Sequence, residues 1–466
     1  MSYSFFNAAM IPVLLASGAI VFAQEAMPTK NGEKSYMPVV IDKDFETIHK
    51  VDAAQKEQVR KQQRQLLEER YDLRDGPAEA KASGGRKALQ EGVRIKLPQN
   101  VTWQQLAEMT PEEIKTKNLF PMGFRPLPHV KHAVGGMVFP EQQVKTMLDL
   151  EKRDLARFDV SFDLPDHLMP EFPPPIFLTS RPDLGDVSQG KVLSIKNYYQ
   201  LLHGKLSPVQ LEGMRLLLTP FPQQQFNATE DRKVIEPSFG VTCLDCHVNG
   251  HTNAAFHQNP DTRPQESRFR LDTVSLRGMY NQQIHGSKRS LRSVEDFTEF
   301  EQRTAYFDGD HVIAAKKGVH LPDRSSQVSM MAQMQNMFDF PPAPKLDEFG
   351  RLKPEMASKQ ELQGQEVFFG KGRCAVCHPA PFYLDDKMHD LHLGRFYDTE
   401  VIASQRNIPD GPIKTFTLRG IKDSPPFHHD GRLLTLDDTV EFYNLVLSLK
   451  LTDDEKKALV AFLRCL

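Results

Sequence analysis

Two copies of a five-residue pattern, Cys-x-x-Cys-His, constrain this chain more than any other feature. Five cysteines in 466 residues are too few for a disulfide scaffold, and four of them fall in the two patterns. Cys-x-x-Cys-His is the attachment signal for c-type haem, in which the thiols bind the porphyrin and the histidine ligates the iron. The sequence therefore predicts two covalently bound haems. Their attachment and ligand residues are Cys243, Cys246 and His247, then Cys374, Cys377 and His378.

Two other kinds of site use paired cysteines. A zinc site built from two Cys-x-x-Cys pairs would not require a histidine after each pair, and these pairs lie far apart in the chain. A thioredoxin-like redox motif needs a βαβ context, which this sequence lacks. The haem interpretation explains both histidines and is preferred.

An internal repeat organises residues 196–466, because four markers occur twice in the same order. In each copy a helical Leu-x-Gly segment comes first, followed by the haem motif, a Leu-Arg-Gly segment and an acidic helix. The paired segments, apart from the haem motifs, are Gln210-Leu211-Glu212-Gly213 with Glu361-Leu362-Gln363-Gly364, Ser275–Gly278 with Thr417–Gly420, and Ser293–Glu301 with Thr435–Tyr443.

The repeat predicts an all-α protein with two cytochrome c-like haem lobes and an N-terminal extension. The expected boundaries are a signal peptide at 1–23, an extension at 24–195, the first lobe at 196–345 and the second at 346–466. The last helix shows how local signals predict a helix. Thr452 and Glu455 form a capping box, and Leu459, Phe462 and Leu463 form an apolar stripe.

The N-terminus and the charge balance bear on location and partners. Residues 8–23 are an uncharged apolar run, too short for a typical membrane span, and a small-residue pattern ends at Ala23. We expect cleavage after about Ala23 and release into the periplasm, with a retained anchor as the alternative.

The charge balance bears on partners. With 58 basic and 61 acidic residues the formal net charge is −3, which argues against a nucleic-acid partner.

The region between the signal peptide and the first lobe carries weaker signals. Residues 44–75 are polar and predict a solvated helix, with an arm on a partner subunit as one use. Residues 160–185 are rich in proline and predict an extended surface connector. The fifth cysteine, Cys465, is interpreted as a small packed residue, with a disulfide in a homodimer as the alternative.

Three segments near the C-terminus form a recognisable series, and they carry a family resemblance. They read Thr417-Leu418-Arg419-Gly420, then Pro426-Phe427-His428-His429-Asp430-Gly431, then Glu441-Phe442-Tyr443-Asn444. This series resembles the second half of the bacterial dihaem cytochrome c peroxidase and MauG superfamily. The resemblance covers about residues 196–466 and is most specific in the second copy.

The resemblance implies that Tyr443 is the distal ligand of the second haem. The family places this ligand fourteen residues after the histidine of its His-Asp-Gly segment, here His429. Typical peroxidases of the family have methionine there, whereas the MauG-like branch has tyrosine. A tyrosinate is a hard anionic donor, which favours oxidised iron over reduced iron. A tyrosine simply packed in a helix is the structural alternative.

The repeat and the resemblance together suggest residues for the first haem. Glu301 occupies the position of Tyr443 in the first copy and is a candidate acid and base for peroxide, with Glu299 as its competitor. The family context around its distal glutamate is missing here, and a solvated helix glutamate is the alternative for each. The resemblance also offers His251 or His257 as a ligand that caps the first haem at rest.

Two further family features concern the electron route between the haems and a bound calcium ion. The tryptophan that the family places between its haems is missing, so His285 or Tyr280 is an alternative electron route. The family also binds calcium between its halves through backbone and amide oxygens. The corresponding positions here are Asp272, Ser424 and Pro426.

The resemblance implies a hydrogen-peroxide-dependent oxidoreductase. Peroxide is expected to react at the haem of His247, while the haem of His378 and Tyr443 receives electrons from a small cytochrome, a cupredoxin or an oxidisable substrate. Two alternatives stay open: a MauG-like enzyme that oxidises a protein or another organic substrate, and a dihaem electron carrier without enzymatic activity.

Overall fold

The computed structural model describes residues 45–74, 78–86, 88–128, 136–155, 164–220, 222–223, 238–239, 241–258, 270–288, 290–301, 324–398, 401–402, 405–406 and 410–466. The expected signal peptide 1–23 lies outside these residues. None of the described helices combines the length and the apolar character that a membrane crossing requires.

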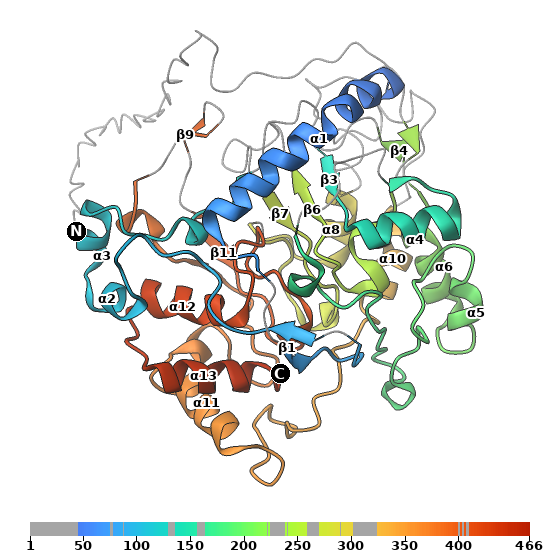
Figure 1. Cartoon of the computed structure of the whole chain (residues 1–466). Coiled ribbons are helices and arrows are strands. Elements are labelled where there is room, and N and C mark those ends of the chain that lie inside the picture. Colours follow the sequence, from blue (N-terminus) through green and yellow to red (C-terminus); the bar gives the residue numbers. More distant parts are fainter. Residues whose placement is uncertain are drawn as a thin grey trace, which may run out of the picture.

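Helices dominate the described chain (Figure 1). The α-helices are α1 (Phe45–Arg70), α2 (Trp103–Glu108), α3 (Pro111–Thr116), α4 (Glu141–Glu151), α5 (Tyr198–Leu202), α6 (Pro208–Leu217), α7 (Cys243–Cys246), α8 (Val294–Glu301), α10 (Ser329–Gln335), α11 (Lys359–Phe369), α12 (Leu436–Val446) and α13 (Asp453–Leu463). Short turns of 3-10 helix are η1 (Met122–Phe124), η3 (Asp166–Leu168), η4 (Pro182–Leu184), η5 (Val248–Gly250), η6 (Met279–Asn281), η9 (Cys374–Val376), η10 (Leu393–Arg395) and η11 (Ile421–Asp423), and η8 (Arg324–Val328) is a π-helical turn.

The strands are all short and antiparallel, and they form small ribbons rather than an extended sheet. They are β1 (Ala78–Lys81), β2 (Ala88–Gln90), β3 (Gly136–Val138), β4 (Pro222–Gln223), β5 (Ser238–Phe239), β6 (Phe256–Gln258), β7 (Arg270–Asp272), β8 (Met388–Asp390), β9 (Val401–Ile402), β10 (Gln405–Arg406) and β11 (Pro412–Lys414). The expected all-α class therefore holds in a coarser form, as a helix-rich fold with a few short strands.

Two pairs of helices pack closely against each other. Helix α6 packs against α10, and α11 packs against α13. A glycine stands at each contact: Gly213 faces the backbone carbonyl of Met330, and Gly364 faces that of Ala458. A Cβ atom at either position would collide with the carbonyl, so glycine is what lets the two helix backbones come this close.

Local capping explains where several helices begin. Helix α13 starts with the expected capping box, in which Thr452 and Glu455 bond each other's backbone N–H groups. The stripe of Leu459, Phe462 and Leu463 is buried as predicted. Complete capping boxes also start α2, α3, α6 and α11, which satisfies N–H groups that have no partner within the helix.

A left-handed glycine follows each haem motif and leads into one 3-10 turn. Gly278 has a φ of 76° and precedes η6, while Gly420 has a φ of 72° and precedes η11. The N–H of Gly278 donates to the carbonyl of Phe338, and the N–H of Gly420 donates to that of Leu466. Each loop is thereby tied to the chain just after the second helix of its pair.

The expected N-terminal extension, residues 24–195, contributes to two cores. Buried side chains of its first part, from Val59 to Leu127, join the core of α11, α12 and α13. Those from Phe139 to Leu193, apart from a group between Leu164 and Met169, join the core of α6 and α10. The region therefore packs along both halves of the molecule.

Two expectations for this region change in detail. Helix α1 is mostly exposed, as predicted, but its end packs on its own chain, where Arg70 donates to the carbonyls of Arg125 and Pro126. The proline-rich segment is not confined to the surface. Leu168 and Ile176 are each 1% exposed because the segment passes from one core to the other.

Candidate haem sites

One cavity of about 320 Å³ brings together the second haem motif and the expected distal ligand. Cys374, Cys377 and His378 line it, and so does Tyr443. Apolar side chains complete much of the wall, which suits a porphyrin face; they include Phe368, Leu436, Val440, Leu459 and Leu463. The two axial candidates come from distant parts of the chain: His378 follows η9, and Tyr443 lies on α12.

The orientation of His378 fits a haem ligand. Its Nδ1 lies 2.8 Å from the carbonyl oxygen of Tyr383 and therefore donates a hydrogen bond to it. That bond leaves the lone pair on Nε2, the nitrogen free to bind a metal. Burial lowers the pKa of His378, which favours the neutral, ligand-competent ring.

Tyr443 lies on α12 and also lines the cavity. Its ring makes an edge contact with the neighbouring Phe442, with centroids 5.2 Å apart. Burial, with Cys377 nearby, raises the pKa of its phenol to about 12. The phenol is therefore neutral here at pH 7, and a cation such as ferric iron would be needed to hold it as phenolate.

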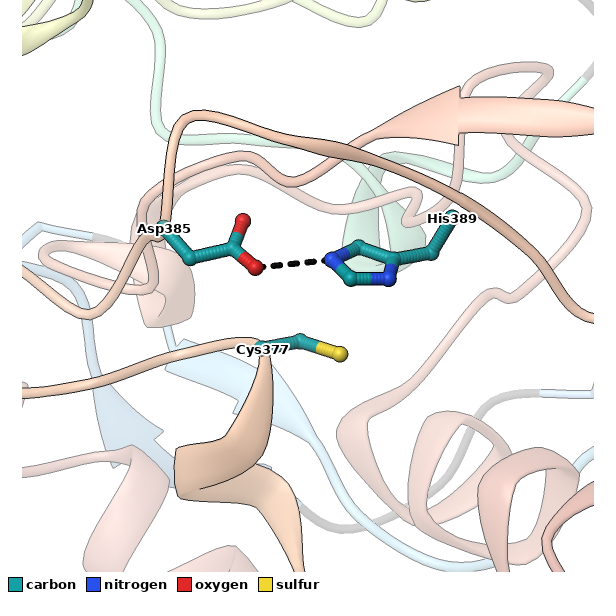
Figure 2. Close-up of side chains that lie close together, drawn as sticks. All are labelled: Cys377, Asp385 and His389. Carbon is teal, nitrogen blue, oxygen red and sulfur yellow. Dashed lines mark hydrogen bonds and ion pairs between the residues drawn. The ribbon is translucent and has the colours of Figure 1, made fainter.

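Sequence reasoning missed a side-chain pair beside Cys377. Asp385 and His389 are bonded at 2.7 Å, and their ligand atoms lie within 4.8 Å of the Cys377 sulfur (Figure 2). The available signal was an aspartate and a histidine four residues apart, just after the haem motif. Because the Cys377 thiol is the expected porphyrin attachment, we interpret the pair as the surroundings of the haem edge rather than a separate metal site.

The first haem motif repeats the histidine geometry. His247 follows α7, and its Nδ1 donates to the carbonyl of Val274 at 2.8 Å, leaving Nε2 as the metal-binding nitrogen. Burial lowers the pKa of His247 to about 4, so the ring is neutral at pH 7. Both motifs thus present a histidine in the form that a haem iron binds.

The two glutamates differ in their relation to this motif. Both lie on α8 and both are partly buried. Burial and, next, the carboxylate of Glu301 raise the pKa of the Cys243 thiol to about 12, which places Glu301 close to the motif. This electrostatic effect on Cys243 is consistent with the expected place of Glu301 near the first motif.

His251 and His257 are the two histidines expected to cap the first haem at rest. His251 is buried, with Nδ1 bonded to the Ser275 hydroxyl and Nε2 to the carbonyl of Asp423, both at 2.8 Å. Both nitrogens are occupied, so His251 is not poised as an iron ligand in this arrangement. His257 lies in β6, paired with β3 and β7, and its side chain is outside the described residues.

The three expected calcium positions meet at the cavity. Asp272, Ser424 and Pro426 all line it, and Asp272 accepts no hydrogen bond at its buried Oδ1. Burial raises the pKa of Asp272 well above its usual value. An unpaired buried carboxylate oxygen is what a bound cation would satisfy, so these residues fit calcium.

The histidines expected to support the sites are both buried. His429 bonds His428 at 2.9 Å and lies 3.7 Å from Asp410, which also pairs with the fully buried Arg432. Burial and Lys414 lower the pKa of His285 to about 4. His285 is thus a neutral ring in a bridge with Leu291.

The other expected electron route, Tyr280, is partly exposed. It donates a hydrogen bond to Asp339 at 3.0 Å, and its ring lies 6.2 Å from that of Phe340. Phe340 in turn lies 6.4 Å from Phe382, the neighbour of Tyr383. Tyr280 therefore has an aromatic connection toward the second motif, and no such chain is seen for His285 among the described residues.

Two Cys-x-x-Cys-His motifs, each with a histidine held in its metal-binding form, are typical of c-type cytochromes. Part of the chain is similar to curated cytochrome-c peroxidases and to MauG. One is the cytochrome-c peroxidase IdrP2 of Denitromonas iodatirespirans, 31% identical over 26% of this chain and 43% of that protein. Another is the methylamine utilization protein MauG of Methylorubrum extorquens, 30% identical over 22% of this chain and 33% of that protein.

The chain spans less than half the length of these curated relatives. A solved structure of a MauG-like protein associated with microbial copper homeostasis shares 15% identity, with a TM-score of 0.38 over 65% of this chain and 94% of that chain. At this score the comparison does not establish a shared fold. No family model matches the chain.

Proposed function

We propose that this chain is a periplasmic dihaem c-type peroxidase, exported with cleavage after about Ala23. Residues 196–345 and 346–466 form its two haem lobes. The paired histidine geometry, His247 with Val274 and His378 with Tyr383, is the observation that carries the proposal. The matching glycine contacts of Gly213 and Gly364 support the two-lobe reading.

The chain's residues take separate roles at the two sites. When bound, the haems supply an iron for peroxide and the one-electron redox steps of the reaction. At the first site Glu301 takes a proton from the near oxygen of peroxide and returns it to the departing oxygen. At the second site His378 and Tyr443 would hold the haem iron, and electrons would enter from a small cytochrome or a cupredoxin. Each peroxide consumes two electrons and two protons and gives two waters.

Calcium is the further cofactor in this proposal. Asp272, Ser424 and Pro426 would hold it between the two halves, where the unpaired Oδ1 of Asp272 supports the assignment. Its role would be to fix the loop that carries His429 next to α12. Homodimer formation belongs to the same proposal, because homodimers are the commonest soluble assemblies.

The test is peroxide addition to the purified dihaem protein, followed by Mössbauer and optical spectroscopy of both irons. A peroxidase gives rapid oxidation at both irons and turnover with a reduced cytochrome donor. Oxidation of both irons without use of such a donor, but with change in a protein or organic substrate, favours the MauG-like alternative. An iron pair that does not respond to peroxide marks an electron carrier.

A further inference from the structure

The first turn of α12, the helix that carries Tyr443, is held by a distant segment. Asp438 is fully buried, and its Oδ1 accepts backbone N–H bonds from Arg94 at 2.6 Å and Ile95 at 3.1 Å. These partners lie more than 340 residues earlier in the chain. The Thr435 hydroxyl also donates to the carbonyl of Gly92 at 3.3 Å.

The cap of α12 is altered to make these contacts. Thr435 accepts the N–H of Asp438 at 3.0 Å, which is the usual first half of a capping box. In α11 and α13 the acid at the matching position returns the bond to its own cap, as Glu361 and Glu455 do. In α12 the carboxylate of Asp438 bonds the segment 92–95 instead.

A second set of contacts holds the same region from the other side. Phe124 packs its ring against Phe442, with centroids 5.1 Å apart and an interplanar angle of 86°. The buried Arg432 donates to the carbonyl of Phe124 at 3.0 Å, and Asp430 accepts the N–H of Leu127 at 2.6 Å. Phe442 is the immediate neighbour of Tyr443, so the position of the tyrosine ring depends on these contacts.

We propose that Asp438 is a positioning residue for the second haem, and that residues 92–95 are a structural part of that haem's axial site. Asp438 fixes α12 against this segment and thereby sets the distance and angle at which Tyr443 faces His378. The proposal rests on the assignment of Tyr443 as ligand. Residues 92–128 contain no haem motif, but they then help to set the position of Tyr443 and so the reduction potential of the haem.

The experiment compares Asp438→Ala, Asp438→Asn and Glu455→Ala in the full-length holoprotein. Glu455→Ala is the matched control. Glu455 occupies the same position in the cap of α13, but its carboxylate bonds the N–H of Thr452 rather than residues 92–95. The readouts are the optical and electron paramagnetic resonance spectra of the second haem, its reduction potential and the thermal midpoint. Asp438→Ala should shift the spectrum and potential of that haem, whereas Asp438→Asn, which keeps the acceptor oxygen, should restore most of the wild-type values.

Two results separate this proposal from the ligand assignment. If Asp438→Ala lowers only the thermal midpoint, as Glu455→Ala does, the positioning role is overturned while Tyr443 stays a ligand. If Tyr443→Phe leaves the haem spectrum unchanged, the ligand assignment fails and the positioning role fails with it. Should Asp438→Ala not mature, Asp438→Glu carries the same comparison, because it keeps the charge and moves the carboxylate by one methylene.

Discussion

The Nδ1 of His378 donates to the carbonyl of Tyr383 across 2.8 Å, and this one bond decides which ring nitrogen can face a haem iron. His247 and Val274 repeat the relation at the first motif. A carbonyl that accepts such a bond fixes the tautomer and the ring angle of a metal-binding histidine. The two histidines are therefore oriented alike at the two motifs.

The mature protein should carry two covalent haems. Both Cys-x-x-Cys-His motifs place a neutral histidine next to their cysteines, so each can hold one porphyrin. Haem staining after denaturing electrophoresis should be positive, and the intact mass should exceed that of the polypeptide by two haems. Cys377→Ala should weaken attachment at the second motif alone. A matured wild-type protein with one haem would contradict the prediction.

Replacing Tyr443 should change the second haem without detaching it. Tyr443→Met exchanges a hard anionic ligand for a neutral thioether, which stabilises reduced iron, so the reduction potential should rise. Redox titration and the optical spectrum measure the change. Tyr397→Phe is the control, because Tyr397 is a buried tyrosine of the same core that does not line the haem cavity. Equal spectra in wild type and Tyr443→Met would make Tyr443 a packed core residue.

Glu301→Gln should slow the peroxide step while leaving the haem spectra near wild type. The amide keeps the shape of the side chain but cannot take and return a proton, a contribution worth about 10² to 10⁴ in rate. Stopped-flow mixing with peroxide measures it. Glu299→Gln on the same helix should have little effect, because the carboxylate of Glu301 is the glutamate that acts on the pKa of Cys243. Unchanged rates in both variants would remove both residues from the mechanism.

The stability of the protein should depend on pH through Asp438. Burial raises its pKa to about 7 from the usual 3.8, so between these values the folded state holds a proton that the unfolded state has lost. This stabilisation is complete below pH 3.8 and disappears as the pH rises through 7. The unfolding free energy should therefore fall as the pH rises, by at most about 1.4 kcal/mol per pH unit from this group.

Asp438→Asn should remove that part of the pH dependence, because an amide does not titrate. Chemical denaturation at several pH values between about 4 and 7 measures the slope. Glu455→Gln is the control. Because Lys371 lowers the pKa of Glu455, any contribution of this residue to the pH dependence of stability falls at acidic pH. An identical slope in wild type and Asp438→Asn would show that Asp438 keeps the same charge in both states.

Features that depend on near neighbours in the chain could be predicted from the sequence. The haem motifs and the Thr452 and Glu455 cap follow from local spacing, because their geometry is set within a few residues. The repeat marks Gly213 and Gly364, but their close contacts with Met330 and Ala458 are tertiary. The family resemblance predicted Tyr443 as a ligand, and the repeat predicted Glu301 as its counterpart, since equal spacing in two copies would place residues on equivalent helix faces.

Which distant segments complete the second site depends on the tertiary structure. The sequence analysis assigned no role to Asp438, whose carboxylate accepts the N–H groups of Arg94 and Ile95, because no local pattern links these residues. His251 looked free to cap an iron, but burial gives both its nitrogens other partners. The physical reason is that buried polar groups must find partners, and packing between segments hundreds of residues apart determines which partners are within reach.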